Sequence, residues 1–342
     1  MAAGGAAVAS KALSQTAAPL GETGVPVPHQ GLPLGPLTQH YPDQAVQMLD
    51  KRFPGVPGTA SVERVASGFR WAEGPAYFAA GRYLVVSDAP NNRMVRLVED
   101  DGRLSTFRQP AMNSNGNTVD REGRLITCEH FTRRVTRTEH DGRITVLAER
   151  WEGKRFSSPN DVAVAPDGSI WFTDPTYGLD GDYEGVKGTR EQPGNYVYRI
   201  DPTSGAVTKV GDGFDQPNGI AFSPDGRTFY VVDSGRPAHI RAFETDLERG
   251  RLKGSRIFAT SGGPGNSDGL RCDINGNLWS SFGWGDPKED GVRCYAPDGT
   301  LLGKIHLPET AANLTFGGPL GNRLYVCAST SIYAVYVSTR GA

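Results

Sequence analysis

Six segments of the chain repeat one pattern, in which an acidic or amide residue is followed eight positions later by a glycine. The pairs are Glu73/Gly81, Asn115/Gly123, Asn160/Gly168, Asn218/Gly226, Asp268/Gly276 and Asn313/Gly321. A short run with alternating apolar residues precedes each glycine, and a second apolar run follows it. This is the pattern of a strand, a tight turn and a second strand. The sequence therefore predicts six antiparallel units of one design.

The spacing of the repeats predicts how these units are arranged. Successive repeats begin 42, 45, 58, 50 and 45 residues apart, and a period of about 40–50 residues with several strands per unit is typical of a β-propeller. The chain of 342 residues contains 44 glycines and 24 prolines and no long helical pattern, which favours an all-β fold. We predict a six-bladed β-propeller over residues 46–342, preceded by an irregular N-terminal extension at residues 1–45.

Two further features of the propeller follow from the pattern. Closing the ring of blades usually combines both chain ends in one blade, which removes an exposed edge. The first strand candidate is Val62–Val65 and the last is Ile332–Val337, so we expect both in the same blade. The longest interval lies between Asn160 and Asn218, and it predicts a long loop that overhangs one mouth of the central channel.

Composition excludes several classes of partner. The formal net charge is −2, so the chain lacks the basic surface that nucleic-acid binding requires. It contains no run of 18 apolar residues that would span a membrane. The four cysteines lack any CxxC spacing, and we expect buried free thiols rather than a disulfide framework or a zinc site. The residues are Cys128, Cys272, Cys294 and Cys327.

The N-terminal extension bears on the location of the protein. Residues 1–45 are rich in Ala, Gly and Pro, and we interpret them as a flexible or surface-draped segment. Met1–Ala18 lacks the basic start and leucine-rich core of a signal peptide. We therefore expect a soluble protein, cytoplasmic by default, or periplasmic if the alanine-rich stretch is the remnant of an export signal. The oligomeric state is left open.

The repeats place one type of chemistry at an equivalent position. If the first strand of each repeat borders the channel, its leading residue lies near one mouth. These residues form a set that we call the oxygen ring: Glu73, Asn115, Asn160, Asn218, Asp268 and Asn313. Hard oxygen ligands suit Ca²⁺, whereas zinc and iron sites usually contain imidazole or thiolate. The alternative is that Asn, Asp and Gly simply favour turns and strand starts. Six oxygen-bearing residues at the equivalent position of six repeats favour a Ca²⁺ site, or a site for another divalent cation.

At these residues the chain resembles the senescence marker protein/gluconolactonase/regucalcin-like family of six-bladed propellers. The matching motifs cover residues 60–338 and include Glu73-Gly74-Pro75, Cys128-Glu129-His130, Pro159-Asn160-Asp161, Trp171-Phe172-Thr173-Asp174-Pro175, Pro217-Asn218-Gly219, Asp268-Gly269 and Asn313-Leu314-Thr315. Their order and spacing are closest to those of bacterial gluconolactonases.

The resemblance implies a catalytic Ca²⁺ at the channel mouth. The metal-binding residues of the family fall on Glu73, Asn160, Asn218 and Asp268, all of them members of the oxygen ring. One difference separates the chain from the regucalcin branch, which carries an arginine two residues before the Asn-Asp asparagine, where this chain has Ser158. Sugar contacts of that branch are therefore not transferred.

We interpret the chain as an enzyme, a Ca²⁺-dependent hydrolase of a sugar lactone of the glucono-1,5-lactone type. Asp268 is the candidate general base or nucleophile beside the metal. The candidates for substrate contact are Asn115, His130, Asp174 and Tyr177. For His130 the alternative is a structural strand-end histidine, and for Asp174 and Tyr177 it is turn chemistry.

Three other readings remain. The first keeps the metal site and changes the substrate to a phosphotriester or an aromatic lactone. The second is a non-catalytic propeller that binds calcium or a protein partner. The third is a serine hydrolase, because Gly265-Asn266-Ser267-Asp268-Gly269 matches the GxSxG pattern. That nucleophile motif needs a preceding strand and a following helix. Here a loop precedes it and a strand follows, so the sequence speaks against a serine nucleophile.

Overall fold

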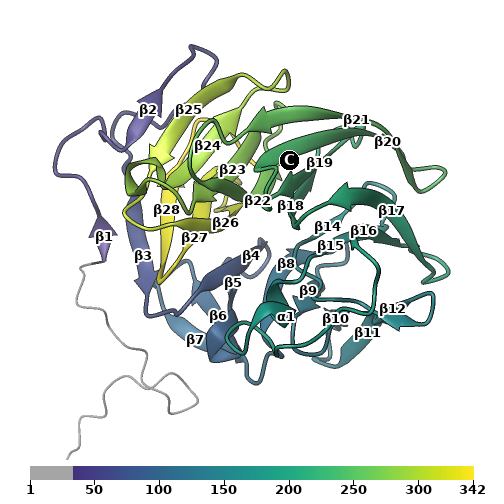
Figure 1. The fold of residues 1–342 in the computed structure, drawn as a ribbon. Helices are drawn as coiled ribbons and strands as arrows, with labels where there is room; N and C mark the ends of the chain where they lie inside the picture. The colour runs from purple at the N-terminus through teal and green to yellow at the C-terminus, as the bar shows by residue number, and fades with distance from the viewer. Residues whose placement is uncertain (1–33) are drawn as a thin grey trace, which may run out of the picture.

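The computed structural model describes residues 34–342 and shows six antiparallel sheets arranged around a central axis (Figure 1). In chain order the first three sheets, inner strand first, are β4 (Ala72–Phe78), β5 (Tyr83–Asp88), β6 (Arg93–Val98), β7 (Leu104–Arg108); β8 (Ser114–Val119), β9 (Leu125–Glu129), β10 (Arg134–Thr138), β11 (Ile144–Ala148); and β14 (Val162–Val164), β15 (Ile170–Asp174), β16 (Asn195–Ile200), β17 (Val207–Phe214). The predicted propeller of six blades is confirmed.

The remaining three sheets complete the circle. They are β18 (Pro217–Phe222), β19 (Thr228–Asp233), β20 (His239–Asp246), β21 (Arg251–Thr260); β22 (Asn266–Cys272), β23 (Leu278–Gly283), β24 (Gly291–Tyr295), β25 (Leu301–His306), β2 (Val46–Met48); and β26 (Ala311–Gly317), β27 (Arg323–Ala328), β28 (Ser331–Tyr336), β3 (Glu63–Ser67), β1 (Gly35–Pro36). As predicted, the first repeat-flanking strand and the last strand share a blade, because β3 pairs with β28.

The N-terminal segment adds strands to two blades. β1 pairs with β3 at the outer edge of the sixth blade, and β2 pairs with β25 at the outer edge of the fifth. The predicted irregular extension at residues 1–45 is thus partly a draped segment, in which residues 34–45 run along the surface between these short strands. Residues 1–33, with the alanine-rich stretch, lie outside the described part of the chain.

The hydrophobic core is divided among the blade interfaces. Six clusters of buried apolar side chains each join two neighbouring blades. Trp171 of the third blade, for example, packs against Phe229 of the fourth with ring centroids 5.1 Å apart. Since alternate residues of a strand point to opposite faces, each sheet buries both faces against its neighbours. All four cysteines are buried and free, as predicted.

Helical structure is short, and it lies in the connections. The long interval of the third blade contains α1 (Tyr177–Asp180), and two 3₁₀ turns occur at Ala89–Asn91 and Pro287–Glu289. A small hairpin of β12 (Arg150–Trp151) and β13 (Lys154–Arg155) precedes the third blade. Among residues 34–342, no helix has the length and apolar character needed to cross a membrane.

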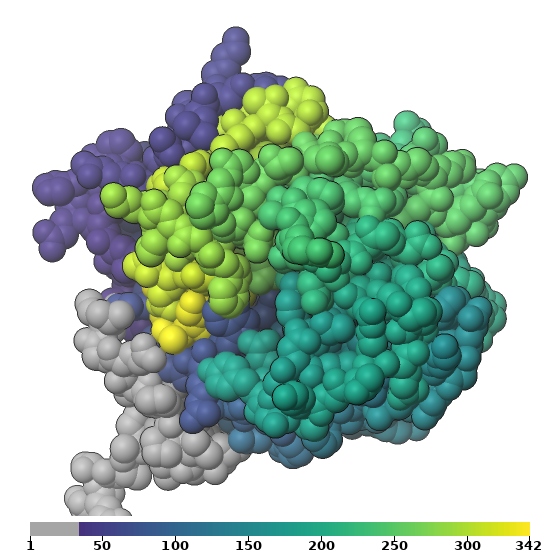
Figure 2. Space-filling view, in the orientation of Figure 1, coloured from purple at the N-terminus to yellow at the C-terminus, as the bar shows by residue number. Residues whose placement is uncertain are grey.

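The predicted long loop follows β15, begins with α1 and projects from the face turned to the viewer in Figures 1 and 2. Its return path is fastened to the helix, because the backbone N–H of Val186 donates to the carbonyl of Gly178 over 3.0 Å. Gly188 bonds to Leu179 in the same way. A side chain at Gly185 would collide with the backbone of Gly178, so the two segments are in direct contact. The loop is therefore a packed structure over the channel mouth.

Candidate active site at the mouth of the channel

The oxygen ring lies where the inner strands begin. Glu73, Asn115 and Asn218 are each the second residue of their strand, and Asp268 is the third residue of β22. Asn313 is likewise the third residue of its strand, β26, in the next blade. Asn160 precedes β14 by two residues. Repeat spacing in the sequence thus corresponds to equivalent positions around the axis.

A β-bulge recurs at the ring position of five inner strands. The register of strand pairing shifts between Glu73 and Ala76, between Ser114 and Asn117, and at the matching points of β18, β22 and β26. A bulge bends its strand and redirects side chains that would otherwise alternate between the two faces of the sheet. The bulges therefore allow these five blades to present their oxygen-bearing side chains at the axis.

Glycines set how closely the blades approach each other at this level. A Cβ atom on Gly74 would lie 1.9 Å from the backbone oxygen of Asn115, the ring residue of the next blade. The same relation links Gly116 to Asn160 at 2.3 Å. The two other members of this set are Gly219, which meets Asp268 at 2.0 Å, and Gly269, which meets Asn313 at 2.2 Å. Only glycine fits between these strands, so the ring is held at a small radius.

Four of the predicted metal ligands line one cavity of about 320 Å³, which we call the acidic cavity. Its lining residues are Trp71, Glu73, Asn115, Asn160, Tyr177, Glu184, Asn218, Ser234, Asn266, Asp268 and Trp284. All four predicted ligands are buried. Side chains that come from four different blades therefore face a common space.

The electrostatics of this space call for a cation. Burial, followed by the charge of Asp161, raises the pKa of Glu73 to about 8. Burial, followed by the charges of Glu73 and Asp161, raises the pKa of Asp268 well above its usual range. The guanidinium of Arg271 lies 3.8 Å from Asp161, Nη1 to Oδ2. Two of the four predicted ligands, Glu73 and Asp268, are carboxylates, and their two negative charges, when both are ionised, equal the charge of one divalent cation.

An unpaired amide oxygen gives a second, independent indication. The Oδ1 atom of Asn160 is buried and has no hydrogen-bond partner among residues 34–342. A buried acceptor without a partner costs free energy, and a metal ion would satisfy it. Within the same residues, no group of three or more His, Cys, Asp or Glu side chains is arranged to hold a metal. A site here must therefore combine carboxylate and amide oxygens, and the residues present fit such a group.

The other two members of the oxygen ring have different surroundings. Asn313 uses its Oδ1 atom to accept from the N–H of Leu314 over 2.8 Å, and its Nδ2 atom donates to Glu73 Oε2 over 3.1 Å. It therefore orients the Glu73 carboxylate, and its own oxygen already has a partner within the chain. Asn115 lines the acidic cavity, where its Nδ2 atom lies 3.4 Å from the carbonyl oxygen of Asn160.

Tyr177, at the start of α1, lies where the sequence predicted a substrate contact. Its side chain lines the acidic cavity together with Ser234 and Asn218. Burial, and then the charge of Asp268, raise the pKa of its hydroxyl well above the usual range. The hydroxyl therefore stays protonated and can donate to a bound oxygen.

Asp174 and His130, which the sequence also predicted as substrate contacts, are not among the residues that line the acidic cavity. The carboxylate of Asp174 is fully buried and accepts from the backbone N–H groups of Ser157 and Ser158 at 2.9 and 2.8 Å. It thereby shapes the turn that leads to Asn160. The reason is turn chemistry, the alternative considered for this residue.

His130 is buried beneath the long loop. Its Nδ1 atom lies 3.0 Å from the backbone oxygen of Glu184, and Gly178 packs against its side chain. Burial lowers the pKa of its imidazole to about 4, so the ring is neutral at physiological pH. His130 therefore contacts the long loop on the side that faces the protein interior, and it is not among the residues that line the cavity.

Sequence reasoning missed five lining residues: Trp71, Glu184, Ser234, Asn266 and Trp284. Trp71 stands two positions before Glu73, and Asn266 two before Asp268, so both could have been found by extending the ring motifs toward the N-terminus. Glu184 and Trp284 lie in connections between strands without any repeated pattern. Only the folded chain brings them to the cavity.

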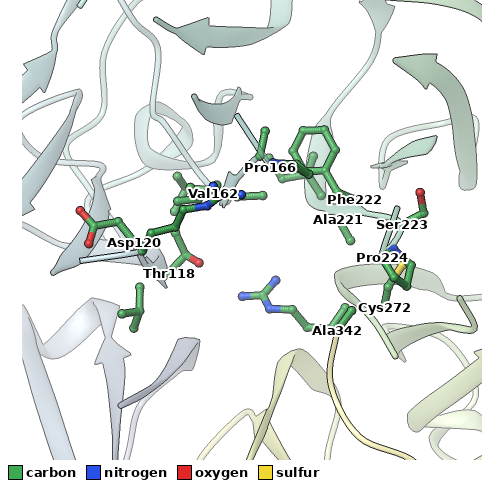
Figure 3. Close-up of a pocket in the computed structure, with 17 residues that line it drawn as sticks. Thr118, Asp120, Val162, Pro166, Ala221, Phe222, Ser223, Pro224, Cys272 and Ala342 are labelled. Atoms are coloured by element: carbon green, nitrogen blue, oxygen red, sulfur yellow. The ribbon is translucent and has the colours of Figure 1, made fainter. Parts of the chain in front are cut away.

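A second cavity of about 440 Å³ lies where the inner strands end (Figure 3). Thr118, Val162, Ala221 and Cys272 surround it, and backbone and apolar side chains dominate its wall. Arg271 lines this cavity, and its guanidinium donates to the carbonyl of Leu270 over 2.6 Å. The two ends of the channel therefore differ: one is lined mainly by carboxylates and amides, and the other mainly by apolar residues, with Asp120, Arg121 and Arg271 as its charged residues.

Comparison with known proteins agrees with this architecture. The family model for the SMP-30/gluconolactonase/LRE-like region matches residues 71–330, and the chain belongs to this family. A gluconolactonase of Zymomonas mobilis is 32% identical over 305 residues, which cover 82% of each chain. A pentonolactonase of Haloferax volcanii is 29% identical over 269 residues, 77% of this chain and 82% of its own.

The solved structures include a gluconolactonase from Xanthomonas campestris that superposes with a TM-score of 0.81 at 35% identity. The match covers 90% of this chain and 98% of that one. The sequence-based assignment to a gluconolactonase-like class of hydrolases is confirmed by these relatives.

Proposed function

We propose that the protein hydrolyses a sugar lactone of the glucono-1,5-lactone type and uses one Ca²⁺ ion held by Glu73, Asn160, Asn218 and Asp268. The observation that carries this proposal is the convergence of these four oxygen-bearing side chains on one buried cavity. Ca²⁺ accepts six to eight oxygen ligands in flexible geometry, including carboxylates and amide carbonyls. The lining residues contain no histidine or cysteine, which zinc or iron would favour.

The cavity supports a small polar substrate. Its volume of about 320 Å³ lies at the lower end of the range for small-molecule sites. Eight of its eleven lining residues are polar or charged, and three are aromatic. This balance favours a hydroxylated lactone over a phosphotriester or an aromatic lactone, which an apolar wall would suit better. A cavity that opens at the channel mouth also speaks against a purely structural ion.

In the mechanism that we propose, Asp268 acts first as a general base and then as a general acid. The bound cation supplies positive charge near the lactone carbonyl, where negative charge develops during hydrolysis. The carboxylate of Asp268 accepts a proton from water as the water oxygen bonds to the carbonyl carbon. When the ring C–O bond then breaks, Asp268 returns that proton to the departing ring oxygen, which leaves an open-chain hydroxy acid.

The neighbouring residues place Asp268 and the substrate for this role. The side chain of Asn218 favours the charged form of Asp268 by lowering its pKa, which opposes part of the effect of burial. Asn115 and Tyr177 line the same cavity and can donate to hydroxyl or carbonyl oxygens of a bound lactone. Asn313 holds Glu73 from the far side through its 3.1 Å hydrogen bond. Positioning of this kind reduces the entropy that the reaction must otherwise lose.

A lactone hydrolysis assay tests the proposal. The enzyme, freed of metal with EDTA, should hydrolyse glucono-1,5-lactone no faster than buffer alone, and added Ca²⁺ should restore the rate. Added Ca²⁺ should also raise the melting temperature, because an ion that binds only the folded state stabilises it. Full activity in EDTA, with no metal retained by elemental analysis, would overturn the role of the metal. No lactone hydrolysis in the Ca²⁺-loaded protein would overturn the proposed activity.

A further inference from the structure

Two tryptophans at the rim of the acidic cavity have no role in the core. Trp71 precedes β4 and Trp284 follows β23, so they come from the first and fifth blades. Their ring centroids lie 4.9 Å apart with the planes tilted by 39°. Neither belongs to the hydrophobic clusters that join the blades. Both line the acidic cavity.

Trp284 is unfavourable for folding in two ways. Its side chain is 60% exposed, although an indole ring gains most from burial. Its backbone is in the left-handed region, with φ at +70°, which is an outlier for a bulky residue. Strained conformations of this kind occur preferentially where a residue contacts a ligand. The combination at a cavity rim suggests that the ring is held there for a bound molecule.

Glu184 lies on the same cavity and comes from the long loop after α1. Its backbone contacts the buried His130, because its carbonyl oxygen lies 3.0 Å from His130 Nδ1. The adjoining Gly185 packs directly on Gly178. Within residues 34–342, its carboxyl group has no hydrogen bond or ion pair to another side chain, and burial raises its pKa to about 7. A half-buried carboxyl without a protein partner is ready to bond with a ligand.

We propose that Trp71, Trp284 and Glu184 form a subsite that selects lactones with a hydroxylated ring. The indole rings would cover the C–H face of the sugar, and the Glu184 carboxyl would bond to one or more of its hydroxyl groups. Aromatic rings combine apolar contact with fixed shape, and a carboxylate is a strong acceptor for hydroxyl donors. The subsite would thus distinguish hydroxylated from unsubstituted lactone rings, while the residues of the oxygen ring and the bound cation would hydrolyse the ester bond. This inference rests on the proposed lactonase function.

A comparison of two lactones tests the subsite. Glucono-1,5-lactone and δ-valerolactone share a six-membered cyclic ester, but only the first carries ring hydroxyls. Glu184→Gln should lower kcat/KM for glucono-1,5-lactone by about 10- to 100-fold, the range for a lost hydrogen bond to a charged group. It should leave δ-valerolactone hydrolysis unchanged, because that substrate has no hydroxyl group for the carboxyl to bind. Trp284→Ala should lower kcat/KM for both lactones, because both present a C–H face to the indole ring. Tyr183→Ala is the matched control, because Tyr183 is an exposed aromatic residue beside Glu184 and does not line the cavity.

Two outcomes would overturn the subsite. One is an equal loss on both lactones in Glu184→Gln with Ca²⁺-induced stabilisation retained, since the carboxyl would then serve the ester chemistry. The other is no loss on either lactone. Each variant is first compared with the wild type by its Ca²⁺-dependent rise in melting temperature, which shows that it folds and binds metal.

A binding experiment separates failure of the subsite from failure of the proposed function. The probe is 1,5-anhydroglucitol, which keeps the hydroxylated ring but has no ester to hydrolyse. It should change the tryptophan fluorescence of the Ca²⁺-loaded wild type in a saturable way, and Trp284→Phe should reduce that change. Saturable binding by a protein without lactonase activity would support the subsite and reject the function. Lactonase activity without any response to the probe would do the reverse.

Discussion

Asn313 donates a hydrogen bond to Glu73 over 3.1 Å, Nδ2 to Oε2, although the two residues are 240 positions apart in the chain. The bond joins β26 of the last blade to β4 of the first, which are neighbours in the closed ring. It directs the Glu73 carboxylate into the acidic cavity, where Asp268 and the neighbouring amides lie. Closure of the propeller and assembly of the site are therefore linked, because the blade that β3 and β28 close also carries Asn313 in β26.

Asp268 is expected to be more than a metal ligand. Asp268→Asn keeps the size of the side chain and one oxygen, and it removes the charge and the base. At saturating Ca²⁺ we expect kcat to stay lowered by about 10²-fold or more, the usual contribution of a positioned acid–base group. Glu73→Gln serves for comparison, and its defect should be mainly one of Ca²⁺ affinity. A kcat near wild type for Asp268→Asn at saturating Ca²⁺ would leave Asp268 as a ligand alone.

Ser267 is not expected to act as a nucleophile. It lies in β22, where it pairs with Phe282, and it does not line the acidic cavity. A strand continues after it where a nucleophile turn would need a helix. Ser267→Ala should therefore retain most of the lactone hydrolysis rate in a steady-state assay. A loss of several orders of magnitude, with folding and Ca²⁺ binding intact, would show that the GxSxG pattern is functional.

Gly219 is expected to be required for the geometry of the ring. A Cβ atom there would lie 2.0 Å from the backbone oxygen of Asp268, so Gly219→Ala must displace β22. Overpacking of this kind costs about 1–3 kcal/mol. We expect a lower melting temperature and weaker Ca²⁺ binding, measured by thermal unfolding and calorimetric titration. Gly58→Ala is the matched control, since no heavy atom lies within 4 Å of its added Cβ. Equal behaviour of both variants would contradict the steric argument.

Stability without metal should depend on pH through Glu184. Burial raises the pKa of Glu184 from 4.5 to about 7, so the folded protein retains a proton that the unfolded chain releases. This contribution to stability is fully present below about pH 4.5 and is lost as the pH rises through about 7. In EDTA, Glu184→Gln should melt about 2 °C or more above the wild type at pH 8 and close to it at pH 5. A constant difference across this range would show that the carboxyl is not desolvated.

The fold was largely predictable from the sequence because its information is local and repeated. Each blade needs alternating apolar residues and a turn, and these recur from Glu73/Gly81 to Asn313/Gly321. The repeat spacing then predicted the number of blades and the shared blade of β3 and β28. The same register identified the four side chains that meet in the acidic cavity, because equivalent positions in a propeller lie at equal height on the axis.

The other residues of the acidic cavity could not be predicted from the repeat pattern. Trp284 and Glu184 belong to connections of irregular length, whose paths depend on contacts with distant segments such as Gly178 and His130. Asp174 was predicted as a mouth residue because it stands at the start of the long loop, yet its carboxylate accepts from the backbone N–H groups of Ser157 and Ser158. Local sequence does not specify whether such a side chain turns toward the cavity or toward the protein.

The sequence by itself thus determined the blades, their number and the oxygen-bearing residue of each, since strand periodicity and turn chemistry act over a few residues. Tertiary structure alone decided how those residues differ. The Oδ1 atom of Asn313 accepts a hydrogen bond from Leu314, whereas the Oδ1 atom of Asn160 has no partner among residues 34–342. Tertiary structure also placed Arg271 beside Asp161 among the buried carboxylates. Burial and charge balance depend on the whole ring of blades, and they exist only after it has closed.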